Sequence, residues 1–317
     1  MKKSIGLTIL LVLLLLHPQY TTEGARYGLL LWYNSVVPAL FPFMVISNLI
    51  VHAGGISALM APVYKILHPF FPVSPAGCYV LVTGILCGCP MGAKTCSDFV
   101  LDGILSREEA KFLLAVCSHP SPMFILGYVY PFFAEYTASW QILLCVYLPV
   151  IVLAFAAKVI YRVPGAAMAH TSANTVPPNA AQAPAPSADE SILAAIEILC
   201  KIGGYLMLFS ILILFIRNTA WIPEPIRLLL IGSMEMTTAV RELASSLDFI
   251  HGFPAAMAAL NFCGFSGLFQ VRSVLNEKKT GLSVRPCFFW KLAHAALSAA
   301  CALGLCIMRS RCRPLSL

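Results

Sequence analysis

Long runs of apolar residues are the feature that most limits how this chain can fold. Hydrophobic residues make up 59% of the sequence and charged residues 11%, and the mean hydropathy is +0.82. Soluble domains average roughly 45–50% apolar and about 25% charged residues. In a bilayer every backbone donor and acceptor must be paired within the chain, so apolar runs of about 20 residues form helices. The sequence therefore predicts an all-α, polytopic membrane protein in a lipid bilayer.

The positive charges lie near the chain ends and beside the predicted spans. The net charge is +7, and it includes positions 2 and 3, Lys158, Arg162 and the "RSRCR" segment at 309–313. Cytoplasmic flanks of membrane helices carry an excess of Lys and Arg. We therefore expect cytoplasmic termini and an even number of crossings. The sequence has no basic stripe with interleaved aromatic residues, which is the pattern that would indicate nucleic-acid binding.

The first 162 residues are expected to form an N-terminal membrane half. Residues 4–16 are predicted to be an uncleaved first helix rather than a signal peptide, because no convincing small-x-small site follows them. Pro38 and Pro42 are expected to kink the next helix, at 28–51. The short apolar segment 56–71 is flanked by prolines, so we expect it to be re-entrant or interfacial rather than spanning.

An Ala/Pro-rich segment at 163–189 is expected to be a flexible linker. The C-terminal half follows at 190–317 and ends in the basic tail. It contains a polar-punctuated segment at 225–246 and a segment at 255–275 that is expected to be re-entrant, because full crossing would place a basic loop outside. Full spans are predicted at 138–161, 191–216 and 287–308. The total is about eight membrane-embedded segments.

The two halves share one order of features. A polar break opens at Gly84 and another falls at 118–122 in the first half, whereas Gly232 and the "CGFSG" segment at 263–267 mark the second. Gly/Pro-interrupted segments at matching places indicate a transporter with internal repeats, whose binding site lies where the broken helices meet. The alternative is that Gly and Pro are common in all membrane helices, so that any two halves look alike.

The stretch "GCPMGAKTCSD" at 88–98 interrupts two apolar runs. Pro90 cannot donate a hydrogen bond, and Gly88 and Gly92 permit conformations that end one helix and start another near Ala93. Unpaired N–H groups at a helix start attract anions, and Lys94 adds a full positive charge. These residues predict a pocket for a carboxylate or another anionic group.

Lys94 also lies one turn before Asp98 on the same helix face. In the alternative interpretation, the two charges neutralise each other as a structural pair. Charges inside membranes are costly and are functional candidates by default, so a gating or coupling role for Asp98 stays open as well.

A helical hairpin is predicted at 76–131. Ser106 and Glu109 match a capping box, which starts a helix at Arg107. Pro120 and Pro122 break the chain again, so that the second break faces the first.

The second break carries polar side chains. Ser118, His119 and Ser121 would bring two hydroxyls and an imidazole to the predicted pocket. His119 is either a hydrogen-bonded structural residue or a proton-linked one.

The second half also places polar groups at its breaks. Glu235 lies among apolar residues, where it would carry a coupling proton or ion or pair with Arg241, unless the segment lies at the membrane interface. Ser266 and Gln270 are suited to hydrogen-bonding a substrate at the other break.

Several segments carry a resemblance to a known family. They are 31–47, "GCPMGAKTCSDFVLDGILSREEAKFLL" (88–114), "SHPSPMFILG" (118–127), 203–213, "MEMTTAV" (234–240) and "GFSGLFQV" (264–271). With them the chain resembles the YlbJ, or SpoVV, family of sporulation integral membrane proteins, within the nucleoside-recognition Gate group. The resemblance implies a protein of the outer forespore membrane, or of the cell membrane, that moves dipicolinic acid.

Two other functions remain open beside this anion transporter. One is a transporter of nucleosides or other neutral solutes, and the other is a spore maturation protein that transports nothing. The sequence contains no nucleophile elbow, zinc-protease motif or phosphate loop, so we do not expect an enzyme. Cys87 and Cys89 lack the spacing of zinc ligands, so we expect no metal and no cofactor. The sequence leaves open whether the chain forms a homodimer.

Overall fold

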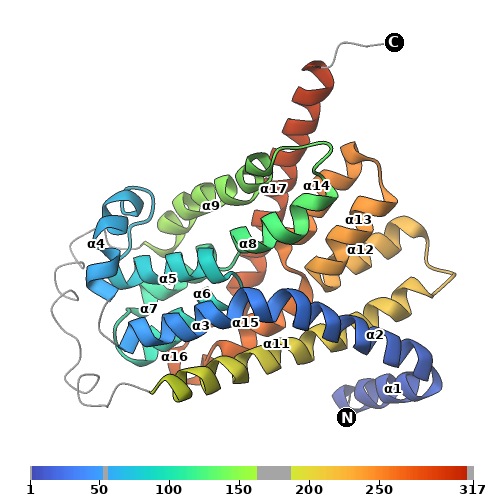
Figure 1. The fold of residues 1–317 in the computed structure, drawn as a ribbon, viewed down its shortest axis with the longest axis horizontal. Coiled ribbons are helices and arrows are strands. Elements are labelled where there is room, and N and C mark those ends of the chain that lie inside the picture. Colours follow the sequence, from blue (N-terminus) through green and yellow to red (C-terminus); the bar gives the residue numbers. More distant parts are fainter. Residues whose placement is uncertain (1, 53–55, 163–186, 313–317) are drawn as a thin grey trace.

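The computed structural model describes residues 2–52, 56–162 and 187–312 (Figure 1). Over these residues the regular secondary structure is helical, as predicted. Four described segments are long and apolar enough to cross a bilayer: Ser139–Tyr161, Ala188–Arg217, Phe249–Val274 and Val284–Ser310. The bent pair Ile5–Leu16 and Pro18–Val36 is a fifth candidate. The chain is thus a polytopic membrane protein with four or five candidate spans, and several shorter helices lie between them.

The N-terminal helices differ from the expected boundaries. α1 (Lys2–Leu16) is followed after one residue by α2 (Pro18–Leu31), which begins ten residues earlier than the helix predicted to start near residue 28. Proline is favoured in the first turn of a helix, so Pro18 supports this start despite the polar residues that follow it. A π-helical turn, η1 (Trp32–Val36), joins α2 to α3 (Val37–His52) just before Pro38. The missing N–H of Pro38 accounts for a widened turn there.

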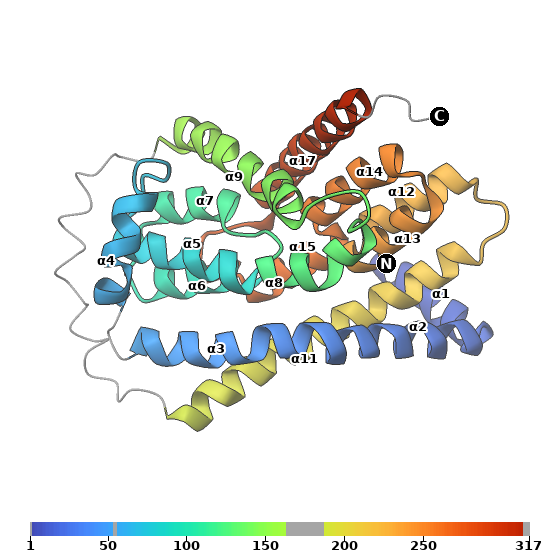
Figure 2. The same ribbon diagram turned by 45° about the horizontal axis from the view of Figure 1, so that its top comes forward.

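α2 lies along the long helix α11 (Ala188–Arg217), as Figures 1 and 2 show. Gly24 and Gly28 face α11 so closely that a Cβ atom would lie 2.6 Å from the Ile211 Cα and 2.7 Å from the Met207 Cα, respectively. Glycines four residues apart are typical of close helix pairs in membranes. The two glycines therefore permit the contact between the first and second halves.

The first half continues with two broken helical pairs and a long helix. Before them, α4 (Ile56–Leu67) is not among the candidate spans. The elements that follow are α5 (Pro75–Cys87), α6 (Met91–Leu101), α7 (Arg107–Val116), α8 (Pro122–Phe124), η2 (Ile125–Val129), η3 (Tyr130–Phe132) and α9 (Ser139–Tyr161).

The second half also contains two broken helical pairs and a long helix after α11. Its elements are α12 (Glu224–Met234), α13 (Met236–Ser246), α14 (Phe249–Phe262), α15 (Gly264–Val274), α16 (Glu277–Thr280) and α17 (Val284–Cys312). α14 and α15 together form one candidate span, so the segment expected to be re-entrant at 255–275 is long enough to cross. That the two halves are internal repeats of each other remains a prediction.

The predicted linker at 163–189 lies mostly outside the described residues. Its last residues belong to the start of α11, where the Ser187 hydroxyl accepts from the Glu190 N–H and the Glu190 carboxylate accepts from the Ser187 N–H. This reciprocal pair is a capping box, which accounts for the helix beginning at Ala188. The basic tail at 313–317 also lies outside the described residues.

Glu109 shows where the predicted capping box of α7 differs from the structure. The Ser106 hydroxyl accepts from the Glu109 N–H at 3.2 Å, as expected. The Glu109 carboxylate instead accepts from the Ser74 N–H at 2.6 Å, and thereby joins α7 to the start of α5. Burial raises the pKa of the Glu109 carboxyl above its usual value, and the bonds from Ser74 partly offset this rise.

The unfolded pKa of Glu109 is 4.5, and we expect the stability of the folded chain to fall as the pH rises above this value. The substitution Glu109→Gln should remove this part of the pH dependence. Because the folded pKa is raised, the contribution of this group is complete below the unfolded pKa and is lost as pH rises through the folded pKa. The glutamine oxygen keeps the acceptor for Ser74 without the charge. Thermal unfolding in detergent at a series of pH values measures the effect.

The exposed neighbour Glu108 supplies the control, since Glu108→Gln removes one charge from the same turn. Its unfolding profile should follow that of the wild-type chain. An unchanged profile for Glu109→Gln would contradict the assignment.

Candidate functional site

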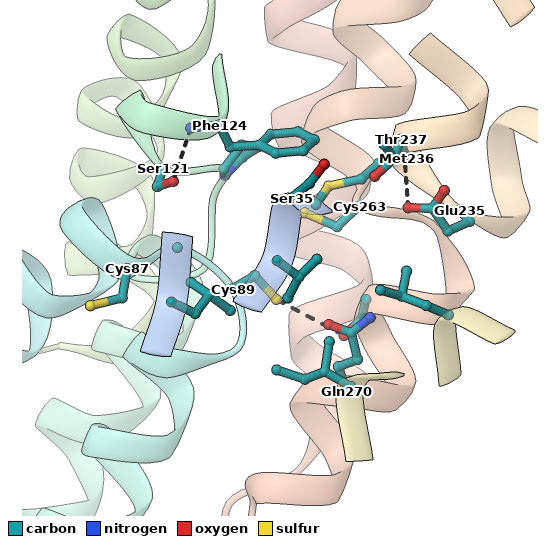
Figure 3. Close-up of a pocket in the computed structure, with 17 residues that line it drawn as sticks. Ser35, Cys87, Cys89, Ser121, Phe124, Glu235, Met236, Thr237, Cys263 and Gln270 are labelled. Atoms are coloured by element: carbon teal, nitrogen blue, oxygen red, sulfur yellow. Dashed lines mark hydrogen bonds between the residues drawn. The ribbon is translucent and has the colours of Figure 1, made fainter. Parts of the chain in front are cut away.

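Four helix breaks in the described residues border one cavity (Figure 3). They are the 88–90 break between α5 and α6, the 117–121 break between α7 and α8, the 235 break between α12 and α13, and the 263 break between α14 and α15. The cavity lining includes Gly88, Ser121, Glu235, Cys263 and Gln270, one or more from beside each break. Segments far apart in the sequence thus meet where the helices are interrupted.

The 88–90 and 117–121 breaks contact each other directly. The Cys89 N–H donates to the His119 carbonyl at 3.2 Å. Gly92 lies on the Cys117 carbonyl oxygen so closely that a Cβ atom would overlap it. The two breaks therefore face each other, as the predicted hairpin required, although α6 resumes at Met91 rather than near Ala93.

Contacts between the halves surround the same cavity. The Tyr128 hydroxyl donates to the Thr237 carbonyl at 3.0 Å. The Cys89 thiol lies 3.9 Å from the Gly267 carbonyl oxygen. In Figure 3, Cys89 and Cys263 approach the pocket from different halves of the chain. The cavity consequently lies between the two halves rather than within one of them.

Glu235 is the buried carboxylate of the site, with 2% of its surface exposed. Its two oxygens accept the N–H groups of Thr237 and Thr238, both at 2.8 Å. A carboxylate at a helix N-terminus satisfies otherwise unpaired donors and interacts favourably with the helix dipole. The glutamate therefore makes the 235 break possible, and its side chain also borders the cavity.

Arg241 does not pair with Glu235. Its guanidinium is exposed and contacts Tyr27 on α2, with 3.3 Å between Nη1 and the hydroxyl. The sequence had left this pairing open, and the structure excludes it because the carboxylate turns back to its own helix start.

Lys94 lies outside the cavity lining. Its ammonium forms an ion pair with Asp98 at 2.5 Å, one turn along α6. Asp98 also borders a separate open groove with Arg272 and Lys278. This arrangement is the structural pair that the sequence offered as the alternative, and the anion site at Lys94 stays a prediction.

We expect Lys94→Ala to destabilise the fold only slightly, because a partly exposed helical pair contributes about 0.3–0.5 kcal/mol. Exchange of the two charges, Lys94→Asp with Asp98→Lys, should restore the wild-type melting temperature. Solute uptake by vesicles that contain each variant provides the functional comparison. Loss of uptake in Lys94→Ala that the exchange does not restore would favour the Lys94 anion site instead.

The other predicted residues lie at or beside the breaks. Pro90 and Ala93 are buried around the start of α6, and Ser118 is buried at the end of α7. Ser121 caps α8 by accepting from the Phe124 N–H at 3.3 Å. The Gln270 side chain donates to the Ser266 hydroxyl at 3.2 Å, one turn apart on α15.

His119 is 1% exposed, and main-chain groups of Val116 and of His119 itself lie beside its ring. The ring contacts Tyr147 edge-on, with 5.3 Å between the ring centroids. Most buried polar side-chain atoms form at least one hydrogen bond.

Three features of the site went unpredicted. Ser35 and Cys263 line the cavity, and Lys291 is buried beside Cys263. A lysine inside the apolar run of α17 is a signal that sequence reasoning can use, since such charges are rare in membranes. Cys263 gave no such signal, because thiols are ordinary apolar residues in membrane helices.

The cavity is small, with a volume of about 60 Å³. That is room for a few water molecules, whereas ligand pockets usually measure several hundred Å³. None of the described residues that line it is a lysine or an arginine. In this conformation the site therefore has room for a few waters only, with Glu235 as its acidic group.

Comparisons with known proteins found one similar curated protein. The chain is 33% identical over 113 residues to the sporulation integral membrane protein YlbJ of Bacillus subtilis (strain 168). The match covers 36% of this chain and 28% of that protein, so less than a third of the relative's length is represented. No protein-family model matches the chain, and no solved structure matches it. The chain is therefore an integral membrane protein that is similar, over about a third of its length, to a membrane protein of sporulation.

Proposed function

We propose that this chain is a transporter that moves a small anionic solute across a membrane of a sporulating cell. Dipicolinic acid is the first candidate solute and the outer forespore membrane the first candidate location. The observation that carries the proposal is the meeting of four helix breaks around one cavity between the halves. Interrupted helices at corresponding places in two halves are typical of transporters that bind solute at the interruption.

The chemistry of the breaks supports this proposal. Non-helical backbone at membrane depth is tolerated where it is buried in protein or lines a water-filled space. Main-chain groups of the 88–90 and 117–121 breaks, the Ser121 hydroxyl and the Gln270 amide provide polar contacts for a solute. The sporulation relative supports the cellular setting.

Transport requires a second conformation. The cavity has room for a few waters, so an aromatic dicarboxylate fits only after the breaks separate. Movement of one group of helices against another around a central site is the usual form of alternating access. The hydrogen bonds between the breaks, such as that from Cys89 to His119, are those that such a movement would exchange.

A neutral solute is the second candidate. It is favoured by the pairing of Lys94 with Asp98 and by the absence of a lysine or arginine from the described cavity lining. Nucleosides are the chemical class that the Gate resemblance suggests. The two candidates differ in whether the site must compensate a negative charge.

The test is uptake of radiolabelled dipicolinate and of a radiolabelled nucleoside by proteoliposomes that contain the purified chain. We expect dipicolinate uptake above that of empty liposomes and little uptake of the nucleoside. Uptake of the nucleoside alone would replace the proposed solute by the second candidate. Uptake of neither compound by correctly inserted protein would overturn the transport proposal for both.

A further inference from the structure

Lys291 is a buried cation in the last long helix, α17. It is 5% exposed and stands in the apolar run "CFFWKLAHAAL". Its ammonium donates to the Ser118 carbonyl oxygen and lies 3.1 Å from the Cys263 thiol. One helix thus brings a positive charge to two breaks from different halves.

The ionisable group in contact with the Lys291 ammonium is the Cys263 thiol. No carboxylate in the described part of the chain lies within ion-pair distance of the ammonium. His294, one turn along α17, uses its Nε2 for the Val146 carbonyl oxygen at 2.8 Å. A buried charge without an ionic partner is costly, so intramembrane cations usually pair or lie along the path of a substrate or ion.

The position of Lys291 is directly behind the cavity wall. Cys263 lines the cavity, and the Lys291 ammonium is in contact with its sulfur. Ser118 precedes the buried His119, so the ammonium also contacts the 117–121 break. A lysine side chain has a flexible four-carbon stem, which allows its ammonium to exchange partners.

We propose that Lys291 is the anion-binding residue of this site, and that its ammonium leaves the Ser118 carbonyl and the Cys263 thiol to bind a carboxylate of the solute. This inference rests on the proposed transport function. It adds that Lys291 is the residue that selects a negatively charged solute. Glu235 gives the cavity a negative group, so an anion needs such a compensating cation. The same exchange releases the 117–121 and 263 breaks from each other, which couples solute binding to opening.

The experiment measures equilibrium binding of radiolabelled dipicolinate to the full chain in nanodiscs. Its neutral analogue pyridine-2,6-dicarboxamide serves as competitor. We expect the wild-type chain to prefer the dicarboxylate, and Lys291→Met to bind it roughly 10- to 100-fold more weakly, as expected for loss of a charged hydrogen bond. The preference over the dicarboxamide should disappear with it. Lys291→Arg should retain a preference for the anion.

Two further variants keep the result interpretable. Lys291→Gln can still donate to the Ser118 carbonyl oxygen, so it should fold with the closed contact and yet lose anion selectivity. Lys158→Met removes a lysine from an exposed position on α9 and should bind as the wild-type chain does.

The outcomes separate the inference from the transport proposal. Dipicolinate binding that is equal in the wild-type chain, Lys291→Met and Lys291→Gln would overturn the role of Lys291 and leave the transporter standing. Failure of the wild-type chain to bind or take up dipicolinate, with uptake of a nucleoside intact, would overturn the anionic solute and the inference together.

Discussion

Replacement of Glu235 by alanine is expected to lower the free energy of unfolding by about 1–3 kcal/mol and to abolish solute uptake. The substitution removes the acceptor of two buried N–H groups, those of Thr237 and Thr238. Buried donors left without a partner cost about 1–3 kcal/mol. The break between α12 and α13 would then lose its cap and the cavity its carboxylate. Thermal unfolding in detergent and uptake by proteoliposomes measure the two effects.

Two variants separate capping from charge. Glu235→Gln keeps one acceptor oxygen, so it should recover part of the stability, and its uptake reports whether the charge itself is required. Glu224→Ala removes an exposed carboxylate from the first turn of α12 and is the matched control. A wild-type melting temperature for Glu235→Ala would show that the cap contributes nothing.

Substitution of Gly92 by alanine is expected to be comparably severe. The added methyl group would overlap the Cys117 carbonyl oxygen and approach within 3.0 Å of the Gly84 Cα. Inserting one methyl group into a packed contact of this kind typically costs 1–3 kcal/mol. Because backbone atoms rather than a flexible side chain occupy the space, α6 must move away from the 117–121 break. We expect a lower melting temperature and loss of uptake.

Gly304 in α17 provides the matched comparison. No heavy atom lies within 4 Å of a Cβ atom placed there, so Gly304→Ala meets open space. Alanine in a helix interior is more favourable than glycine by roughly 0.5–1 kcal/mol. Gly304→Ala should therefore be neutral or stabilising. Equal effects of the two substitutions would contradict the close approach at Gly92.

The fold class and the approximate positions of the helix breaks could be predicted from the sequence, because both depend on residues that are close together in the chain. Apolar runs require paired backbone groups in a bilayer, and this requirement selects helices before any tertiary contact forms. Pro90, the Ser106 cap and the "CGFSG" segment act on the backbone within a few residues, so these interruptions lie close to where the sequence predicted them. The breaks expected to open at Gly84 and Gly232 were placed too early, because α5 continues to Cys87 and α12 to Met234. Pro18 shows the limit of this reasoning, because a proline that suits the first turn of a helix lengthened a segment expected to begin near residue 28.

Partners across long sequence separations were decided by the tertiary structure alone. The Glu109 carboxylate left its own helix cap for Ser74, 35 residues away, and Arg241 went to Tyr27 rather than to Glu235. Lys291 and Ser118 are separated by 173 residues, so no local pattern links them. The sequence by itself determined an all-α membrane protein with interrupted helices, because those properties depend on backbone hydrogen bonding. Which charge stands beside the cavity depends on how the halves pack, and packing assigned that place to Lys291 while it left Lys94 with Asp98.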